Sequence, residues 1–235
     1  MDGLDWQAPL GWFPPGMLDG QWTRLERLRA EHAGELWRAM DGAPDVWRWL
    51  PDGPFETGAD YAVHIARQAR SDDPAFYAIR GEAGWSGVGA AMRIDRANGV
   101  IEIGHLCFAP GLQRSRAATE AIFLMADHAF AHGFRRLEWK CNARNLPSRR
   151  AARRLGFAYE GTFRQAGMVK GENRDTAWFA TLDGEWPVLR GAFEIWLARE
   201  NFDAGGRQRR GLSGLVEAAA ARLGRPGLNA LEGLG

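Results

Sequence analysis

A short basic segment, Gln113-Arg114-Ser115-Arg116, stands directly before a stretch whose apolar residues have helical spacing. The first turn of a helix presents backbone N–H groups and the positive end of the helix dipole, which together bind phosphate. Ser115 is suited to cap this helix, and Arg114 and Arg116 are suited to contact phosphate oxygens. The segment therefore indicates a pyrophosphate site, although an ordinary capped helix with solvated arginines would show the same residues.

A second basic helix is predicted to begin at Asn145. Pro147 follows the asparagine closely, as is usual where an N-cap residue precedes the first helical turn. Four arginines of this helix fit either a solvated basic face or an RNA-binding face: Arg149, Arg150, Arg153 and Arg154. No aromatic residues interleave with them and the formal net charge of the chain is only +1, so nucleic acid is the less favoured partner.

Together, the stretches LQRSRAATEA (112–121) and CNARNLPSRRAARRLGF (141–157) resemble the GNAT superfamily of N-acetyltransferases, specifically its RimJ/RimL-like branch. The resemblance covers roughly residues 15 to 185 and is strongest at Asn145, Ser148 and the Leu-Gly-Phe at 155–157. It implies an α/β (α+β) fold, the GNAT acyl-CoA N-acyltransferase fold, in which helices flank a mixed central sheet with splayed parallel strands.

The resemblance implies that acetyl coenzyme A is the cosubstrate, that no metal takes part, and that a primary amine attacks directly in a ternary complex. The acceptor would be a protein or peptide N-terminus or a small amine. An α-amino group, with a pKa of about 7.7–8.0, loses its proton more readily than a lysine at about 10.4. The acceptor groove is expected beside the early helices, the 47–55 turn and the 163–171 hairpin, with Trp47, Trp49 and Phe55 lining it or packed in the core.

Acyl transfer to an amine also needs a polarised carbonyl and a proton for the departing thiolate. By the resemblance, Glu102 accepts the amine proton and Ser148 protonates the thiolate. Glu102 would otherwise be a solvent-facing strand residue, and Ser148 would otherwise satisfy its own helix end. Backbone N–H groups near Phe108 would polarise the carbonyl. The implied cofactor-binding residues are Phe108, Gln113, Arg114, Ser115, Arg116, Ala117, Ala118, Asn145 and Ser148.

The sequence departs from the family pattern at two positions. Arg116 stands where the phosphate loop usually has glycine, and arginine is costly if that position needs a positive φ. Ala152 stands where many relatives carry a tyrosine that protonates the thiolate. Both departures favour the alternative function, a catalytically inactive GNAT-fold binding or sensor module.

Other polar residues give weaker signals. His128 and His132 are one helical turn apart but lack the glutamate of an HExxH zinc motif. His105 alternates with Cys107 along a predicted strand, so we expect it to pack in the sheet, on the face opposite to Glu102. Cys107 and Cys141 have no CxxC spacing and lie in apolar segments, which predicts buried free thiols.

The composition excludes several classes of protein. A hydrophobic content of 46% is enough for a buried core, and a net charge of +1 gives no global field toward nucleic acid or membrane. The apolar runs are too short to span a bilayer, and the first residues do not read as a signal peptide. We therefore expect a cytoplasmic protein, and the tryptophan-rich last helix and the tail favour a homodimer.

The periodicity predicts a mixed α/β order of elements. Strands are expected at 20–28, 75–81, 85–94, 99–108, 135–141, 157–165, 166–171 and 174–182. Helices are expected at 30–40, 58–70, 115–133, 145–157 and 183–201. We assign residues 1–203 to one acetyltransferase domain, and residues 204–235 to a linker and a helix-prone tail that is either frayed or docked on a second subunit.

Overall fold

The computed structural model describes residues 5–224 and has the mixed α/β fold that the sequence predicts. The chain divides into two compact units, Met1–Leu137 and Glu138–Gly235. The division falls inside strand β6 (Arg136–Asn142), so the candidate phosphate loop belongs to the first unit and the helix after Asn145 to the second. The expected splay of two parallel strands involves both units and stays a prediction.

Five strands, each antiparallel to its neighbour, form the sheet of the first unit in the order β1-β2-β3-β4-β5. They are β1 (Met17–Asp19), β2 (Arg24–Arg27), β3 (Ala75–Gly81), β4 (Gly84–Asp95) and β5 (Val100–Phe108). The predicted meander over residues 75–108 is confirmed. Strand β1 was not predicted, because three residues are too few to show a period of two.

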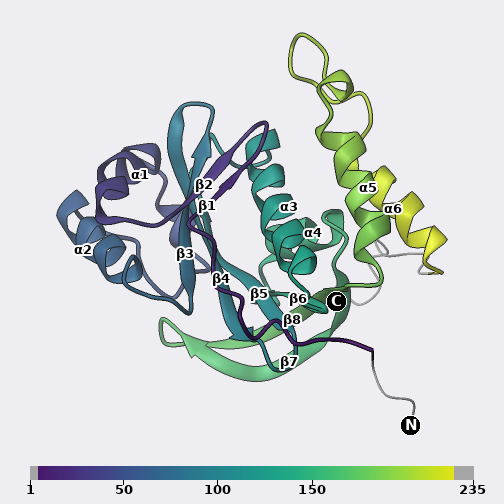
Figure 1. Ribbon diagram of the computed structural model, residues 1–235. Helices are drawn as coiled ribbons and strands as arrows, with labels where there is room; N and C mark the ends of the chain where they lie inside the picture. Colours follow the sequence, from purple (N-terminus) through teal and green to yellow (C-terminus); the bar gives the residue numbers. More distant parts are fainter. Residues whose placement is uncertain (1–4, 225–235) are drawn as a thin grey trace. The chain divides into compact units, whose positions relative to one another are not determined.

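Helices cover both faces of this sheet. α1 (Ala33–Ala39) and α2 (Gly58–Gln68) lie on one side of the strands and α3 (Arg116–Ala131) on the other (Figure 1). Two short 3-10 helices, η1 (Ala30–His32) and η2 (Pro44–Trp47), flank α1 along the chain. The core under α1 and α2 includes Leu36, Ile65, Phe76 and Val88, all buried. This core fixes α2 against the strands that carry the site.

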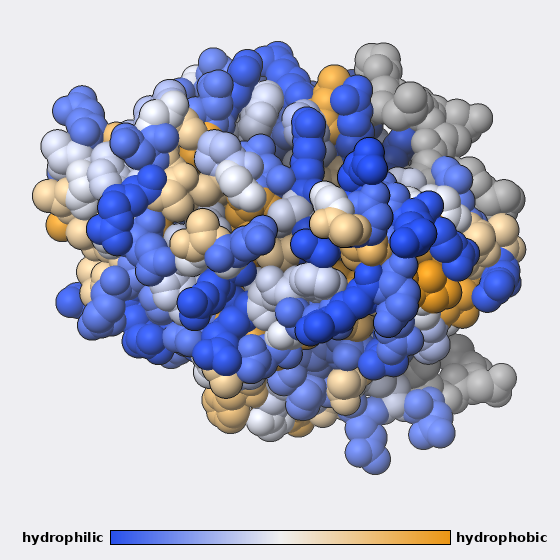
Figure 2. Space-filling view, turned by 90° about the horizontal axis from the view of Figure 1, so that it is seen from above, coloured by the Kyte–Doolittle hydropathy of each residue, from blue (hydrophilic) through white to orange (hydrophobic). Residues whose placement is uncertain are grey.

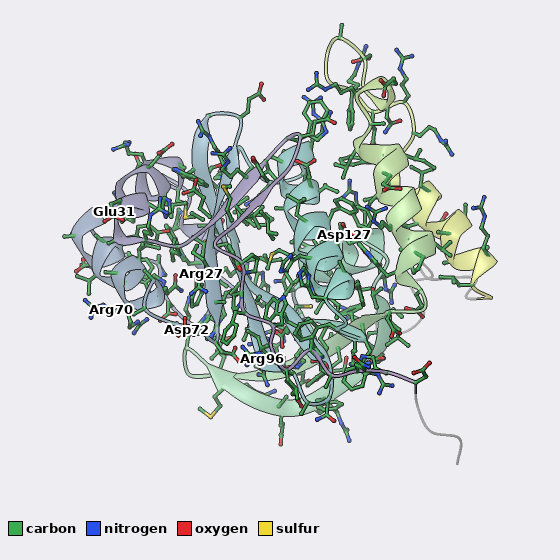
Figure 3. The ribbon with its side chains drawn as sticks, in the orientation of Figure 1. Arg27, Glu31, Arg70, Asp72, Arg96 and Asp127 are labelled. Atoms are coloured by element: carbon green, nitrogen blue, oxygen red, sulfur yellow. The ribbon has the colours of Figure 1, made fainter. Side chains whose placement is uncertain are left out.

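Two arginines hold loop segments against the strands within the first unit. Arg27 of β2 lies beside Asp72, which follows α2, with 3.5 Å between the guanidinium and the carboxylate (Figure 3). Arg27 also donates a hydrogen bond to the carbonyl oxygen of Ser71. Arg96 donates to the carbonyl oxygen of Trp12 at 2.7 Å. These contacts hold the end of α2 and the N-terminal segment against the strands.

A β-bulge interrupts β5 shortly before the strand ends at Phe108. The pairs on either side are Val88↔Cys107 and Ala90↔Gly104. Two residues, His105 and Leu106, therefore stand opposite a single residue of β4, and His105 takes a left-handed φ of 49°. Glu102 pairs with Met92 and Cys107 pairs with Val88, and these two partners are four residues apart on β4, so they point to the same face. The side chains of Glu102 and Cys107 therefore share a face. The prediction that His105 and Cys107 share the face opposite to Glu102 was therefore wrong for Cys107.

The second unit contains three strands, with β8 (Glu172–Leu182) between β6 and β7 (Ala158–Val169). Residues 157–171 were predicted as two short strands, but β7 runs through them and pairs antiparallel with β8. Its register shifts between Phe163 and Gly167, and Gln165 has a left-handed φ of 52°. This local irregularity explains why the sequence predicted two strands instead of one.

The helices of the second unit are α4 (Leu146–Arg154), α5 (Trp186–Leu197), η3 (Arg199–Asn201) and α6 (Leu212–Arg222). α6 packs against α5 of the same chain and buries Leu212, Leu215, Val216, Ala219 and Ala220. The segment between them is an ordered turn, because Asn201 and Asp203 accept hydrogen bonds from its backbone. The expected tail beyond residue 224 lies outside the described residues.

The surface shows no large apolar face in the view of Figure 2, where hydrophilic residues predominate and hydrophobic ones gather in small patches. Within residues 5–224, none of the helices has the length and apolar character needed to cross a bilayer.

Candidate active site

The candidate phosphate loop joins β5 to α3. Ser115 is the N-cap residue of α3, and its side-chain oxygen accepts a hydrogen bond from the Ala118 N–H at 3.0 Å. Gln113 folds back and donates to the carbonyl oxygen of Phe108 at 2.9 Å. The first turn of α3 contains no acidic residue. The predicted cap is confirmed, and a helix end that combines two arginines with no carboxylate fits an anionic ligand.

The left-handed residue of this loop is Arg114, with φ 59°, and not Arg116. Arg116 is the first residue of α3 and has ordinary helical geometry. The departure from the family glycine at this position therefore carries no backbone strain. Its guanidinium lies over the ring of Trp22, 4.0 Å from the ring centroid.

Glu102 lies in the middle of β5 and is only 5% exposed, so it is not a solvent-facing strand residue. Its carboxylate is 3.1 Å from the guanidinium of Arg93 on the neighbouring strand β4. A carboxylate buried to this extent requires such a partner, because desolvation of an isolated charge is costly. The residue is therefore a charged group held inside the sheet, several residues before the loop.

In the second unit, Asn145 caps α4 as predicted, and its side-chain oxygen accepts a hydrogen bond from the Ser148 N–H at 3.1 Å. The Ser148 hydroxyl accepts a hydrogen bond from the indole N–H of Trp139 at 3.0 Å. Burial raises the pKa of the nearby Cys141 thiol, and a hydrogen bond from Ser148 to its sulfur offsets part of that shift. The hydroxyl is thus oriented by side chains and does not cap the helix.

The arginines of α4 do not form a solvated basic face. Arg149 and Arg153 are buried, and their guanidinium groups lie over the ring of Tyr159 at 5.6 and 6.0 Å. Arg154 lies over the ring of Trp196, and burial lowers its pKa. Of the four arginines, Arg150 alone is exposed. The interpretation of this helix as a solvated face is therefore wrong, and the geometry gives no support to an RNA-binding face.

Ala152, on the same helix, is fully buried at 0% exposure. The tyrosine that many relatives carry at this position has no space here without displacement of its neighbours. The sequence departure is therefore matched by close packing around the smaller side chain.

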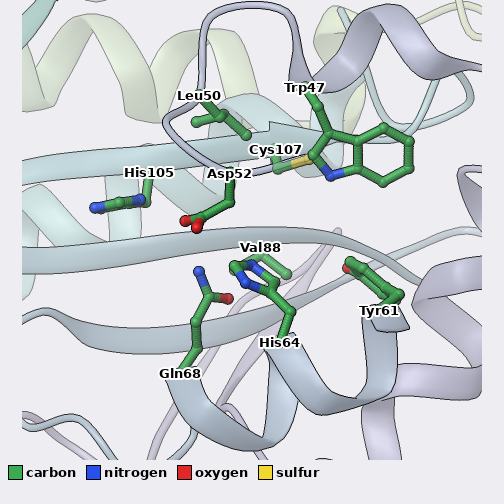
Figure 4. A pocket seen from close by; sticks show the side chains of 9 residues that line it. All are labelled: Trp47, Leu50, Asp52, Tyr61, His64, Gln68, Val88, His105 and Cys107. Atoms are coloured by element: carbon green, nitrogen blue, oxygen red, sulfur yellow. The ribbon is translucent and has the colours of Figure 1, made fainter. Parts of the chain in front are cut away.

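A pocket opens in the first unit between α2, the η2 segment and β5 (Figure 4), beside the early helices and the 47–55 turn where the acceptor groove was expected. Its lining residues are Trp47, Leu50, Asp52, Tyr61, His64, Gln68, Val88, His105 and Cys107. Of the aromatic residues expected at the acceptor groove, Trp47 lines the pocket. Phe55 packs behind it against the rings of Trp47 and Tyr61. Trp49 lies instead against the guanidinium of Arg48.

The protonation states in this pocket follow from burial. Burial lowers the pKa of His64, and the neighbouring Arg67 and His105 lower it further, against a raising effect of Asp52. Burial raises the pKa of the Cys107 thiol to about 12 and that of the Tyr61 hydroxyl well above its usual range. Cys107 therefore stays protonated at neutral pH and is not a nucleophile.

The structure places the predicted site residues in two groups. Glu102, Phe108 and the loop residues 113–118 belong to β5 and the segment that follows it in the first unit. Asn145 and Ser148 belong to the start of α4 in the second unit. No group of three or more histidine, cysteine or acidic residues suited to a metal ion occurs among residues 5–224.

Comparisons with known proteins identify the family of this fold. Residues 23–158 match the family described as "Acetyltransferase (GNAT) domain". A GCN5-related N-acetyltransferase from Brucella melitensis has a similar structure, with 45% identity and a TM-score of 0.83, over 88% of this chain and 99% of that chain. A probable acetyltransferase of the GNAT family from Chromobacterium violaceum is 40% identical, with a TM-score of 0.74, over 80% of this chain and 96% of that chain.

More distant structures share the fold alone. One is described as an acetyl transferase from Salmonella typhimurium that modifies the N-terminal serine of the 50S ribosomal subunit protein L7/L12. It is 19% identical to this chain, with a TM-score of 0.61, over 71% of this chain and 98% of that chain. No curated protein matches the sequence.

Proposed function

The chain belongs to the GNAT acetyltransferase family, and from that premise we propose that it transfers an acetyl group from acetyl coenzyme A to a primary amine. The observation that carries the proposal is the start of α3. Ser115 caps the helix, Arg114 and Arg116 flank the cap, and no carboxylate competes with an anion in the first turn. This arrangement suits the pyrophosphate of the coenzyme.

The proposed cofactor contacts follow the loop. The backbone and side chains of residues 113–118 would hold the pyrophosphate, and Asn145 would border the pantetheine. Backbone N–H groups near Phe108 would polarise the thioester carbonyl as charge develops on its oxygen. The coenzyme supplies an activated acetyl group, and the protein supplies its orientation and the proton transfers.

Ser148 is the proposed donor of a proton to the departing thiolate. The indole N–H of Trp139 donates to its oxygen, and its own proton is directed at the Cys141 sulfur, so the proposed transfer requires the hydroxyl to rotate toward the coenzyme. Glu102 is the carboxylate that the family resemblance assigns to the amine proton, acting through water. Its carboxylate is paired with the guanidinium of Arg93 at 3.1 Å.

The acceptor is a primary amine, of a protein or peptide N-terminus or of a small molecule. An α-amino group needs only a modest base, because its pKa of about 7.7–8.0 is close to neutral pH. Assignment to the RimJ/RimL-like branch, and with it an N-terminal acceptor, is part of this proposal. The proposal also includes a cytoplasmic location, where acetyl coenzyme A is available.

A second candidate is a GNAT-fold binding module without turnover. The observation that favours it is Ala152, because close packing leaves no place for the tyrosine that protonates the thiolate in many relatives. The two candidates differ in one respect. Both bind acetyl coenzyme A, and only the enzyme acetylates an amine.

Calorimetric titration with acetyl coenzyme A tests the proposal directly. We expect a micromolar dissociation constant for the unaltered protein and a value weaker by about tenfold or more for Arg116→Glu, whose carboxylate repels the pyrophosphate. Arg70→Glu is the matched control, since it makes the same charge change at an exposed arginine beyond α2. No binding by the unaltered protein would contradict both candidates.

An amine screen then separates the two candidates. The protein and acetyl coenzyme A are incubated with small amines and with peptides that have free N-termini, and the released thiol is measured. Acetylation of any of these amines supports the enzyme. Tight binding of the coenzyme with no acetylation supports the binding module.

A further inference from the structure

The pocket of Figure 4 gathers polar side chains from three separate segments around one space. Asp52 follows η2, His64 and Gln68 lie one turn apart on α2, and His105 comes from β5. Figure 4 shows the Asp52 carboxylate, the Gln68 amide and the His64 ring near one another, with the His105 ring to the left of them in the view. The remaining wall is aromatic and apolar. The space between these side chains opens to solvent.

The β-bulge is what brings His105 into this space. A bulge inserts one extra residue and turns the local side chain to a new direction. His105 is the residue at the irregularity and has a left-handed φ of 49°, a conformation that residues other than glycine adopt rarely. Its ring contacts Phe76 edge-on at 5.2 Å on one side. Such backbone positions are typical of functional residues.

The pocket adjoins the strand end at which the acetyl group is expected. Cys107 lines the pocket, and the next residue is Phe108, near which backbone N–H groups would polarise the thioester carbonyl. A group bound in the pocket is therefore close to the reacting carbon. Glu102 does not line the pocket. Its carboxylate lies beside Gly104, the residue before His105.

The charges and rings of the pocket favour a cation. The Asp52 carboxylate attracts a positive group and is only partly neutralised by Arg67, whose guanidinium is 3.0 Å away and exposed. The aromatic rings of Trp47 and Tyr61 add a surface of the kind that attracts ammonium ions. Leu50 and Val88 leave room for an apolar substituent beside the charge.

We propose that this pocket binds the acceptor as a primary ammonium ion with a short apolar substituent, and that His105 accepts its proton before the amine attacks. The inference deepens the proposed acetyl transfer and rests on it. One N–H bond of the ammonium ion breaks and its proton goes to an imidazole nitrogen of His105. The freed lone pair forms the N–C bond, the C–S bond breaks, and a second amine proton is lost as the thiolate is protonated. His105 returns its proton to solvent.

His64 assists by charge and not by contact with the reacting atom. The two imidazoles interact electrostatically, so a proton on one opposes a proton on the other. The groups around the pair are Asp52 from the η2 segment, Arg67 and Tyr61 from α2, and Cys107 from β5. Burial, Arg67 and the His105 imidazole lower the pKa of His64, so a positive charge on the His64 ring is disfavoured beside the amine. A neutral imidazole is the form in which a histidine accepts a proton.

Binding to the pocket is tested without turnover by NMR of protein with labelled histidines. The probe is 2-phenylethylammonium chloride, and neutral 2-phenylethanol is its matched control. We expect the His64 and His105 signals to shift with the ammonium probe at millimolar concentration, and much less with the alcohol. His132, at the end of α3, should not respond. Absence of any shift at His64 and His105 would overturn the proposal.

The proton-transfer role is tested with His105→Gly, because glycine accepts the left-handed backbone of this position. With an amine found in the screen, we expect kcat/KM to fall about 100-fold or more and to recover in part when imidazole is added. Affinity for acetyl coenzyme A should stay within about twofold. His132→Asn is the control and should keep full activity. Recovery with imidazole distinguishes a lost base from a structural defect.

Three outcomes separate this inference from the proposed function. If His105→Gly retains activity while Glu102→Gln loses it, acetyl transfer stands and the assignment of the base to His105 is wrong. If the His105 signal shifts with the probe but no amine is acetylated, the proposed function fails while the ammonium site remains. If both the shift and the imidazole-rescued loss are seen, the proposal is supported in full.

Discussion

The guanidinium of Arg116 lies over the indole ring of Trp22, 4.0 Å from the ring centroid. Trp22 belongs to the turn between β1 and β2, which is more than 90 residues earlier in the chain. The same turn is tied to α3 by Glu120, one helical turn after Arg116. The candidate phosphate loop therefore has a wall that comes from the start of the chain.

Glu120 is the anchor of this turn, and we expect its loss to destabilise the first unit. Its carboxylate oxygens accept hydrogen bonds from the N–H groups of Gln21, Trp22 and Thr23, at 2.9, 2.5 and 2.8 Å. Glu120→Ala would leave buried donors without an acceptor and should lower the free energy of unfolding by about 2–3 kcal/mol. Urea unfolding measures this difference.

The control for Glu120 is Glu31→Ala, at an exposed glutamate of η1, which should change stability by less than about 0.5 kcal/mol. Because Trp22 is held by the same turn, Glu120→Ala should also weaken acetyl coenzyme A binding, whereas Glu31→Ala should not. Equal stability of the two variants would show that Glu120 does not anchor the turn.

His128 should make stability depend on pH below neutrality. Its Nε2 accepts a hydrogen bond from the indole N–H of Trp12 at 3.1 Å, which requires an unprotonated nitrogen. Burial, with a further contribution from His132, lowers the pKa of His128 to about 4. Between the unfolded value of about 6.5 and this value, the unfolded chain binds a proton that the folded chain does not. Stability should therefore fall as the pH drops from about 6.5 toward 4.

The measurement for His128 is the thermal midpoint at pH 7, 5.5 and 4.5. His128→Gln retains a side-chain acceptor for Trp12 but does not titrate, so its midpoint should decline less over this range. The two proteins should differ most at the lowest pH. A parallel decline in both would assign the pH dependence to other groups.

Local signals in the sequence predicted much of the fold. The end of α3 near Gly133 and the start of α4 at Asn145 follow from a left-handed glycine and an N-cap asparagine, and both are confirmed. The bulge at His105 could not be predicted in this way. It exists only relative to the register of β4, so the alternation of β5 alone gave the wrong face for Cys107.

The same distinction between local and tertiary features applies to the candidate site. The loop residues around Ser115 are neighbours in sequence, and their pattern was sufficient to predict a capped helix with basic residues at its start. The pocket joins Asp52, His64 and His105, whose segments are brought together by the tertiary fold alone. One signal was available: Tyr61, His64 and Gln68 share a face of α2 at helical spacing, and a polar stripe there indicates a wall.

Both cysteines should be unreactive in the folded protein. Burial raises the pKa of Cys107 to about 12 and raises the pKa of Cys141, and both side chains are buried. We expect no reaction with Ellman's reagent over minutes at pH 8, and reaction of two thiols per chain in about 6 M guanidinium chloride. Rapid modification of one thiol in the native state would contradict the packing around that residue.

Replacement of Ala152 by the tyrosine of many relatives should harm this protein. Ala152 is fully buried on α4, and a larger side chain forces neighbouring groups apart at a cost of about 1–3 kcal/mol or more. Arg150→Tyr is the control, because the same residue is introduced at an exposed position of the same helix. We expect Ala152→Tyr to lower the thermal midpoint by several degrees without a gain in kcat, and Arg150→Tyr to leave the midpoint nearly unchanged. If Ser148, held by Trp139, protonates the thiolate, an added hydroxyl has no role to fill. A well-folded Ala152→Tyr protein with raised kcat would instead show that the thiolate lacks a proton donor in the unaltered chain.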